Sequence, residues 1–286
     1  MPITFRQVEH PYQADSPFSY AALKGIDLDI QEGKVTAIIG ETGSGKSTLV
    51  QHLNALLLPT GGEIEILDKT IIAKEKPKNL KALRKQVGLV FQFPEYQLFE
   101  ETIARDISFG PKNFGVSEEE ALQRTKDVLK VVGLDESYME KSPFDLSGGQ
   151  KRRIAIAGIL AMDPSVLVLD EPTAGLDPQG AKDMMQLFQD MNTKYHKTVL
   201  IVTHDMEHVL NYCDRVVVVK DGYIKKHCDV QAFFENINLL KELRINPPAV
   251  IRLREELRAK GFQIDSSILD IEALAEAVAK EVKARG

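Results

Sequence analysis

KVTAIIGETGSGKSTLV, residues 34–50, carries the signal that decides the fold of this chain. A β-branched apolar run leads into a glycine-rich turn and then into an apolar-periodic segment, which predicts strand, loop and helix in that order. The loop fits the pattern G-x-x-x-x-G-K-[ST], in which glycines let backbone N–H groups point at phosphate oxygens and the helix N-terminus adds partial positive charge. The expected phosphate-binding residues are Gly40, Glu41, Thr42, Gly43, Ser44, Gly45, Lys46, Ser47 and Thr48.

Two side chains of this loop carry chemistry of their own. Lys46 is expected to reach the β- and γ-phosphates of a nucleotide, and Ser47 to offer its hydroxyl to Mg²⁺, with Thr48 beside it. A glycine-rich turn can match the pattern by chance, but the strand before the loop and the helix after it are the context that phosphate binding requires. The loop therefore predicts a site for a nucleotide and Mg²⁺.

Strand and helix patterns alternate along the rest of the chain. Short apolar runs that end in polar residues predict buried strands at 87–92, 165–172 and 198–205, and a hairpin at 215–224. Apolar periodicity predicts helices at 46–58, 117–133 and 178–195. The alternation predicts an α/β fold with a mostly parallel sheet, in which ligands bind beyond the carboxyl ends of the strands.

Capping residues set the expected ends of these helices. Ser117 is expected to cap the helix at 117–133, with Glu120 completing a capping box and Gly133 ending the helix. Pro59 is expected to stop the helix that follows the phosphate loop.

The chain is expected to have two parts. Residues 1–235 form a nucleotide-binding domain, and within it the stretch 93–164 has little strand character and predicts an inserted helical subdomain. Residues 236–286 are helical in pattern, with a break at Pro247-Pro248, and predict a small C-terminal helical extension.

Two carboxylates end the strand at 165–172. In VLVLDEP, Asp170 lies nearest the strand and is expected to hold Mg²⁺ through its water shell. Glu171 is expected to act on the water that attacks the γ-phosphate, either as general base or by positioning it. A strand that simply ends in charge is the alternative, and the phosphate loop in the same chain argues against it.

Two other strand ends carry groups that suit the same chemistry. His204, in IVTHD, can donate a hydrogen bond to the γ-phosphate, and Gln92, which ends VGLVFQ, can bridge the metal site and a moving segment. Each is an ordinary polar strand end when taken alone. Because both strands are expected to end at the same edge of the sheet as Asp170, we expect one catalytic group.

A second glycine-rich stretch, LSGGQ at 146–150, is surplus to that site. It opens a helix, so its N–H groups and the Ser147 hydroxyl form an anion-binding end, with an ordinary helix cap as the alternative. Because one site is already complete, we expect this end to bind the γ-phosphate of a nucleotide held by another subunit, in a dimer that closes on nucleotide and opens after hydrolysis. The residues assigned to this role are Ser147, Gly148, Gly149 and Gln150.

Composition excludes other classes of protein. The 286 residues carry a net charge of −6, which argues against binding nucleic acid by bulk charge. No stretch approaches the ~18 apolar residues that span a bilayer, and the N-terminus has no apolar signal core. The two cysteines, Cys213 and Cys228, favour a reduced compartment over a disulfide framework. We expect a cytosolic protein, or one that a partner holds at a membrane.

This set of motifs resembles the nucleotide-binding domain of ABC ATPases, which are P-loop NTPases, over about residues 1–235. The resemblance implies ATP and Mg²⁺ as cofactors. It also implies a role at the nucleotide site for Asp177, which ends the D-loop match AGLD. It further implies an aromatic side chain from the first strands stacked on adenine, for which Tyr12 is the best candidate. The competing rings are His10, Phe18 and Tyr20.

The chain plan narrows the class of ABC ATPase. The segment between Gln92 and Ser147 has no room for the long coiled coil of a chromosome-type ATPase, and translation-factor types usually carry two such sets of motifs rather than one. The stretches 91–115 and 145–164 resemble the energy-coupling factor transporters, most of all the second of their two ATPases. A stand-alone cytosolic ABC ATPase and the motor of another ABC importer remain alternatives.

That resemblance implies partners and a location. A second related ABC ATPase, a transmembrane scaffold protein and a membrane subunit that captures a vitamin or metal ion would join this chain at the cytoplasmic face of the membrane, where ATP hydrolysis powers uptake. Phe93, Tyr96, Leu98 and Phe99 predict either a groove for a short scaffold helix or part of the helical-subdomain core.

The tail predicts one more apolar face. Ile271, Leu274 and Val278 recur at helical spacing, with Ile268 leading into them and Ala277 beside them. Such a face either covers the chain's own surface or contributes to the contact between the two ATPases.

Overall fold

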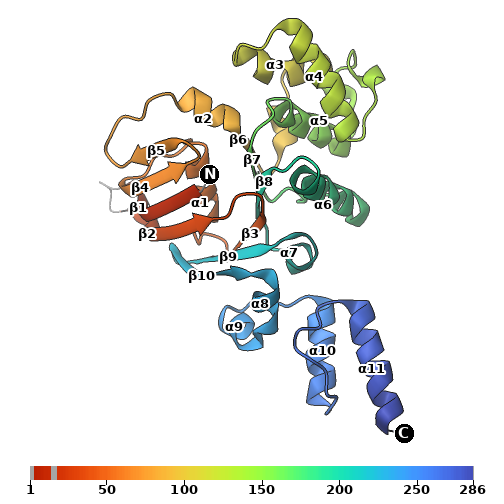
Figure 1. The fold of residues 1–286 in the computed structure, drawn as a ribbon. Helices are drawn as coiled ribbons and strands as arrows, with labels where there is room; N and C mark the ends of the chain where they lie inside the picture. Colours follow the sequence, from red (N-terminus) through yellow and green to blue (C-terminus); the bar gives the residue numbers. More distant parts are fainter. Residues whose placement is uncertain (1–2, 14–17, 286) are drawn as a thin grey trace.

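The computed structural model describes residues 3–13 and 18–285, and its central element is a six-stranded sheet with the strand order β10-β9-β3-β8-β7-β6 (Figure 1). All its strands are parallel except the edge strand β10, which forms the expected hairpin with β9. Its central strands β3 and β8 are mostly apolar and buried at every position, as parallel strands covered on both faces must be. The strands are β3 (Val35–Ile39), β6 (Val87–Val90), β7 (Val166–Asp170), β8 (Thr198–Val202), β9 (Arg215–Lys220) and β10 (Tyr223–Asp229).

A second, antiparallel sheet with the order β2-β1-β4-β5 packs against the first, and the sequence patterns did not predict it. Its inner face buries Phe5, Ile26 and Ile64 against Ile38 and Val168 of the parallel sheet. Its inner and outer residues alternate along β4, which is the pattern of a half-buried strand. The strands are β1 (Ile3–Tyr12), β2 (Tyr20–Ile30), β4 (Gly61–Ile66) and β5 (Lys69–Ile72). Residues 14–17, within the stretch considered for the adenine contact, lie outside the described residues.

Helix α1 (Lys46–Leu53) is shorter than the predicted 46–58, so Pro59 does not end it. The helix ends in a Schellman-type turn, in which Leu56 N–H donates to the Gln51 carbonyl and Ala55 N–H to the His52 carbonyl. Ala55 has the left-handed φ of 53° that this turn requires. The side chain of Asn54 also accepts from Leu56 N–H, which offers the backbone an alternative to the helical bond.

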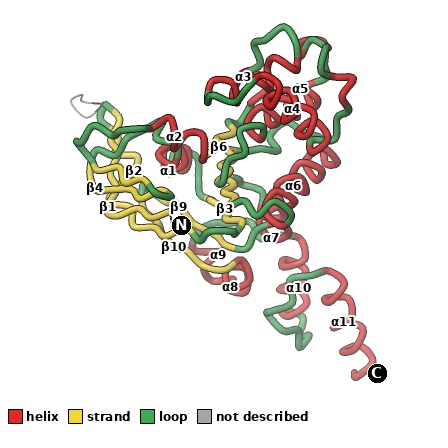
Figure 2. The backbone as a smooth tube through the Cα atoms, turned by 45° about the horizontal axis from the view of Figure 1, so that its top comes forward, coloured by secondary structure: helices red, strands yellow, loops and turns green. Residues whose placement is uncertain are grey.

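A helical layer covers the other face of the parallel sheet (Figure 2), as expected for the insertion. Ser117 caps α4 by accepting from Glu120 N–H, but the Glu120 carboxylate binds Arg124 instead of completing the predicted capping box. Gly133, with φ of 76°, ends that helix as expected. The helices of this layer are α3 (Ile103–Asn113), α4 (Glu118–Val131), α5 (Gly148–Leu160) and α6 (Pro178–Thr193), with short 3-10 turns at Pro94–Gln97, Glu136–Tyr138 and Pro143–Asp145. Helix α2 (Leu80–Gln86) instead packs Leu83 into the core shared with the antiparallel sheet.

The C-terminal helices form a third core against β3 and β9. Leu274 is buried in this core and Val278 packs at its edge, whereas Ile271 is 55% exposed and does not belong to the predicted face. Because this core joins residues on both sides of position 235, the division of the chain there remains a prediction. The helices are α7 (Met206–Tyr212), α8 (Val230–Glu235), α9 (Ile237–Glu242), α10 (Ala249–Ala259) and α11 (Ile271–Arg285).

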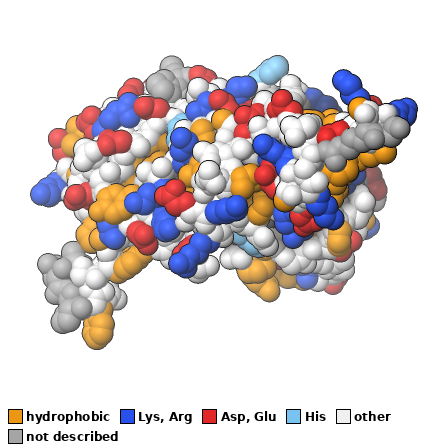
Figure 3. All heavy atoms as spheres, turned by 90° about the horizontal axis from the view of Figure 1, so that it is seen from below, with side chains coloured by type: hydrophobic (Ala, Val, Ile, Leu, Met, Phe, Trp, Pro, Cys, Tyr) orange, Lys and Arg blue, Asp and Glu red, His pale blue; other side chains and the backbone are white. Residues whose placement is uncertain are grey.

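The surface carries charges of both signs. Lysine and arginine side chains alternate with aspartate and glutamate across the face seen in Figure 3. No helix within residues 3–13 and 18–285 is long and apolar enough to cross a membrane. Cys213 and Cys228 are both free thiols.

Candidate active site

The strand order brings the predicted site residues to one edge of the parallel sheet. Lys46 follows β3, His204 follows β8, Asp170 ends β7 and Gln92 follows β6, and these strands are neighbours in that order. Since the strands run parallel, their carboxyl ends meet at the same edge. Residues that are far apart in the sequence thus form one row of side chains.

The phosphate loop is shaped by glycines that no other residue can replace. Gly40 has φ of 151°, and a Cβ on it would lie 2.0 Å from the Val219 carbonyl oxygen. Gly45 has φ of 107°, and a Cβ there would lie 2.4 Å from the Ala22 carbonyl oxygen. The backbone therefore curls tightly against β2 and β9, which is the shape that turns successive N–H groups inward.

Lys46 and Ser44 are the polar side chains held inside this curl. Lys46 Nζ donates to the carbonyl oxygens of Gly40 and Glu41, at 2.8 and 2.9 Å. Burial lowers the pKa of Lys46, while Glu171 and Asp170 raise it. Ser44 is buried, and its hydroxyl has no hydrogen-bond partner within the described part of the chain. Buried donors of this kind suit a ligand rich in acceptor oxygens.

The two carboxylates of β7 lie in different surroundings. Burial raises the pKa of Asp170, and the Ser47 hydroxyl and Lys46 act in the opposite direction. Glu171 adopts a left-handed φ of 49°, and its N–H donates to the Val202 carbonyl of the neighbouring strand. A non-glycine residue held in that conformation is strained, and such strain clusters at functional sites.

His204 contacts Glu171 directly. Its Nδ1 lies 2.9 Å and 3.0 Å from the two carboxylate oxygens of Glu171. Nδ1 is therefore the protonated nitrogen, because a carboxylate only accepts, and Nε2 is left for another partner. Gln92 is exposed, and its backbone carbonyl accepts from Arg152.

The LSGGQ stretch caps α5 in the helical layer, whereas α1 lies against the antiparallel sheet (Figure 1). Ser147 Oγ accepts from Gln150 N–H, and Gln150 Oε1 accepts from Ser147 N–H, so these two residues form a capping box. A Cβ added at Gly148 or Gly149 would meet nothing within 4 Å. Unlike Gly40, these two glycines are not required by the chain's own packing.

Tyr12 and Tyr20 both line a cavity of about 200 Å³ beside the phosphate loop, together with Gly43, Lys46 and Ser47. The Tyr12 hydroxyl lies 3.2 Å from Thr48 Oγ1, and the Tyr20 hydroxyl donates to the Gly43 carbonyl. The other two rings considered for the adenine contact, His10 and Phe18, do not line this cavity. His10 is buried behind the cavity, and Phe18 is 83% exposed and does not line it.

Comparison with known proteins agrees with this geometry. The ABC transporter family model matches residues 23–174. The energy-coupling factor transporter ATP-binding protein EcfA2 of Enterococcus faecalis is 52% identical, over 100% of this chain and 99% of its own length. The protein of the same name from Geobacillus kaustophilus is 48% identical, over 97% of this chain and 96% of its own. The chain belongs to the EcfA2 family of ABC transporter ATP-binding proteins.

Solved structures place this ABC ATPase among known nucleotide-binding cassettes. CbiO1 of Clostridium perfringens, described as part of the ABC transporter complex CbiONQ, is 38% identical with a TM-score of 0.73, over 88% of this chain and 98% of its own. The cassette MJ0796 was solved as a dimer in a post-hydrolysis state with ADP and phosphate. It is 31% identical with a TM-score of 0.71, over 80% of this chain and 98% of its own. The α/β P-loop fold expected from the sequence is confirmed.

Sequence reasoning missed the role of Arg152 in this ABC ATPase. Arg152 is one of three basic residues that follow LSGGQ, and it is only 2% exposed. Its guanidinium donates to both carboxylate oxygens of Glu95 and to the carbonyls of Gln92, Pro172 and Ala174. One side chain thus connects α5, called the signature helix below because it begins with LSGGQ, to the Gln92 segment and to the turn after Glu171. The only early signal was an arginine inside an apolar helical run.

We expect Arg152→Met to lower the free energy of unfolding by about 3–5 kcal/mol, since it leaves the half-buried Glu95 carboxylate and three carbonyls without their donor. Urea unfolding of the two proteins measures this change. Arg153→Met is the matched control, because Arg153 is more exposed and its ion pair with Asp183 is 3.4 Å long, so it should cost about 1 kcal/mol or less. Equal losses in the two variants would contradict the role given to Arg152.

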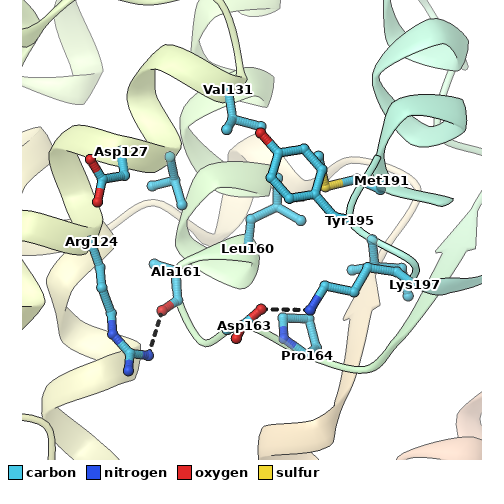
Figure 4. A pocket seen from close by; sticks show the side chains of 12 residues that line it. Arg124, Asp127, Val131, Leu160, Ala161, Asp163, Pro164, Met191, Tyr195 and Lys197 are labelled. Carbon is cyan, nitrogen blue, oxygen red and sulfur yellow. Dashed lines mark hydrogen bonds and ion pairs between the residues drawn. The ribbon is translucent and has the colours of Figure 1, made fainter. Parts of the chain in front are cut away.

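A cavity of about 310 Å³ lies at the opposite edge of the sheet (Figure 4). It opens between α4, α6 and the turn after α5, near Leu167 and Lys197 at the starts of β7 and β8. Asp163 accepts from Lys197 at 2.5 Å, and Arg124 donates to the Ala161 carbonyl across it. Its lining includes none of the expected site residues, so position at the carboxyl ends of the strands, rather than size, marks the nucleotide site.

Proposed function

We propose that this chain is the ATPase subunit of an energy-coupling factor transporter, in which its ATP-driven closure onto a second, related ATPase powers uptake of a vitamin or metal ion. The observation that carries the proposal is identity of about half over the full length to proteins named for that role. The row of side chains at the carboxyl edge of the sheet supplies the chemistry.

The mechanism assigns one task to each part of that row. Lys46 exchanges its two carbonyl acceptors for oxygens of the β- and γ-phosphates. Glu171 holds the attacking water and takes its proton, while His204 keeps the carboxylate in place through Nδ1 and offers Nε2 to the γ-phosphate. Gln92 contacts the metal site, so binding or loss of the γ-phosphate there can move the segment that follows Gln92. The loop from Gly40 to Thr48 cradles the phosphates, with Tyr12 against adenine.

The residues present fit Mg²⁺. Among the described residues no group of three or more His, Cys, Asp or Glu side chains is arranged to hold a metal ion. Mg²⁺ needs no such cage, because it is usually held by one or two carboxylates together with substrate phosphates and water. Asp170, a half-buried carboxylate whose pKa is raised by burial, would hold it with Ser47 and Gln92. When bound, it would neutralise charge on the phosphate oxygens.

The signature helix supports a second subunit. Its open glycines leave room for a phosphate of another chain, and Asp177, at the exposed start of α6, lies at the end of the turn after Glu171. We assign Ser147 and Gln150 to the same contact between subunits. Their capping box lies at the start of α5, where it would face the γ-phosphate held by the other subunit. The exposed side of α11, with Ile271 and Val282, is a further place for contact between the two ATPases.

We expect Ser147→Arg to leave ATP binding by this chain within about twofold, but to abolish ATP-driven association with the second ATPase. The longer cation fills the space that the open glycines leave. Light scattering with and without ATP, beside equilibrium ATP binding, measures both quantities. Ser137→Arg, on an exposed turn of the same helical layer, is the control and should associate normally. Normal ATP-driven association of Ser147→Arg would exclude a dimer in which this helix end binds the nucleotide of the other subunit.

Exposed rings after Gln92 support a membrane partner. Phe93 and Tyr96 lie 6.0 Å apart, and Phe99 packs edge-on against Phe109 at 4.9 Å, with Tyr96 84% exposed. Leu98 is buried in the helical layer, so it belongs to the core and not to the groove. We propose that the rings receive a short helix of the transmembrane scaffold, which holds the chain at the cytoplasmic face.

Purification from native membranes in mild detergent tests the proposal. Recovery with a second ATPase, a membrane scaffold and a capture subunit is the expected result, and the capture subunit would identify the substrate class. Recovery only from the soluble fraction would favour a stand-alone ABC ATPase. Recovery with a different type of membrane protein would make the chain the motor of another importer.

A further inference from the structure

Two histidines lie side by side behind the nucleotide cavity. His10 is on β1 and His52 on α1, which packs against the antiparallel sheet (Figure 1). His52 is fully buried and His10 nearly so. The ring centroids are 4.9 Å apart with an interplanar angle of 83°, an edge-to-face contact.

The pair joins the two walls of the cavity. The edge-to-face series continues from His10 to Tyr12, whose rings are also 4.9 Å apart, at 74°. The Tyr12 hydroxyl contacts Thr48 Oγ1 at 3.2 Å, and His52 Nδ1 lies 2.7 Å from the Thr48 carbonyl. Tyr12, His10, His52 and Thr48 therefore form a closed ring of contacts that connects β1 to the end of the phosphate loop.

Protonation in this ring is fixed by its partners. His52 Nδ1 must carry the proton, because a carbonyl oxygen only accepts. Burial lowers the pKa of His52 to about 4, so the ring is neutral near pH 7. Its Nε2 is then an acceptor, which the nearby Leu58 carbonyl cannot satisfy, and it has no donor among the described residues. His10 Nδ1 donates to the Leu58 carbonyl at 3.2 Å, which holds the second ring in place.

An apolar core does not need this arrangement. Leucine or phenylalanine would fill the space behind β1 without leaving a buried nitrogen unpaired, which is costly. The two imidazoles instead provide two specific contacts. The ring of His10 packs edge-to-face against Tyr12, and His52 donates a hydrogen bond to the Thr48 carbonyl. Both of these contacts act on residues that line the nucleotide cavity.

We propose that His10, backed by His52, is a positioning residue that sets the plane of the Tyr12 ring and so determines affinity for the base of the nucleotide. The proposal rests on the proposed stacking of Tyr12 on adenine. It assigns no chemical step to either histidine. Its consequence is a loss of binding that depends on the base and not on the phosphates.

The test compares ATP with inorganic tripolyphosphate, which offers the phosphate loop a ligand without a base. With the full-length chain, His10→Ala should weaken ATP binding about tenfold, within the range of a lost base–aromatic stack, while tripolyphosphate binding is unchanged. His10→Phe, which keeps the ring edge, should restore most of the ATP affinity. His52→Leu should act in the same direction. In the assembled complex, KM for ATP should rise with kcat unchanged.

A double-mutant cycle of His10→Ala and Tyr12→Ala shows whether the role of His10 or the role of Tyr12 is wrong. His10→Ala should have no further effect on ATP affinity once Tyr12 is removed. Equal weakening of ATP and tripolyphosphate by His10→Ala, or no rescue by phenylalanine, would mean that His10 only supports the fold and would overturn the inference. If Tyr12→Ala itself leaves the ratio of the two affinities unchanged, the stacking role of Tyr12 fails first.

Discussion

Glu171→Gln is expected to lower kcat for ATP hydrolysis in the assembled transporter by about 10²–10⁴-fold, the contribution of a positioned general base. Glutamine has nearly the same shape, and its amide oxygen can still accept from His204 Nδ1, so the geometry around the nucleotide is retained. It cannot take a proton from water. ATP affinity should therefore change little, and the ATP-bound dimer should accumulate because the step that opens it is blocked.

Initial rates of phosphate release, with equilibrium ATP binding beside them, measure this effect. Glu119→Gln is a matched control, since Glu119 is exposed on α4 and is outside the proposed site, and it should retain full activity. A Glu171→Gln protein that hydrolyses ATP at the normal rate would remove Glu171 as the base. A protein that no longer binds ATP would mean that the carboxylate holds the loop in shape.

Gly40→Ala is expected to weaken ATP binding about 100-fold or more. A methyl group at this position would lie 2.0 Å from the Val219 carbonyl oxygen and 2.8 Å from Ser44 Oγ, and alanine is also strained at φ of 151°. The loop must shift away from β9 to relieve the contact. Because N–H groups at a phosphate site act only when they point at the oxygens, a small shift removes several hydrogen bonds together.

Equilibrium binding of labelled ATP measures this loss, with thermal unfolding as a check of the fold. Gly158→Ala is the matched control: Gly158 lies within α5, its added Cβ would come no nearer than 3.9 Å to Ile107, and alanine favours a helix. That variant should bind ATP normally and unfold at the same or a higher temperature. Normal ATP binding by Gly40→Ala would show that the observed curl of the loop is not the binding conformation.

The sequence by itself determined the local parts of this protein. Glycine spacing predicted the loop before α1, and polar residues at the ends of apolar runs predicted which side chains lie at the carboxyl edge of the sheet. These inferences succeed because they depend on short-range sterics and hydrogen bonding, which neighbouring residues settle among themselves. The same short-range rules correctly predicted Ser117 as a cap and Gly133 as a helix end.

Only the tertiary structure decided what depends on distant partners. The place where α1 ends, the second sheet, the burial of Arg152 and the position of His10 behind Tyr12 all arise from packing between segments far apart in the chain. The local sequence around Arg152 does not reveal that five acceptor atoms, brought in by two other segments of the chain, surround its guanidinium. Burial is a property of the whole assembly of elements, and a charge changes its role when burial replaces water with fixed partners.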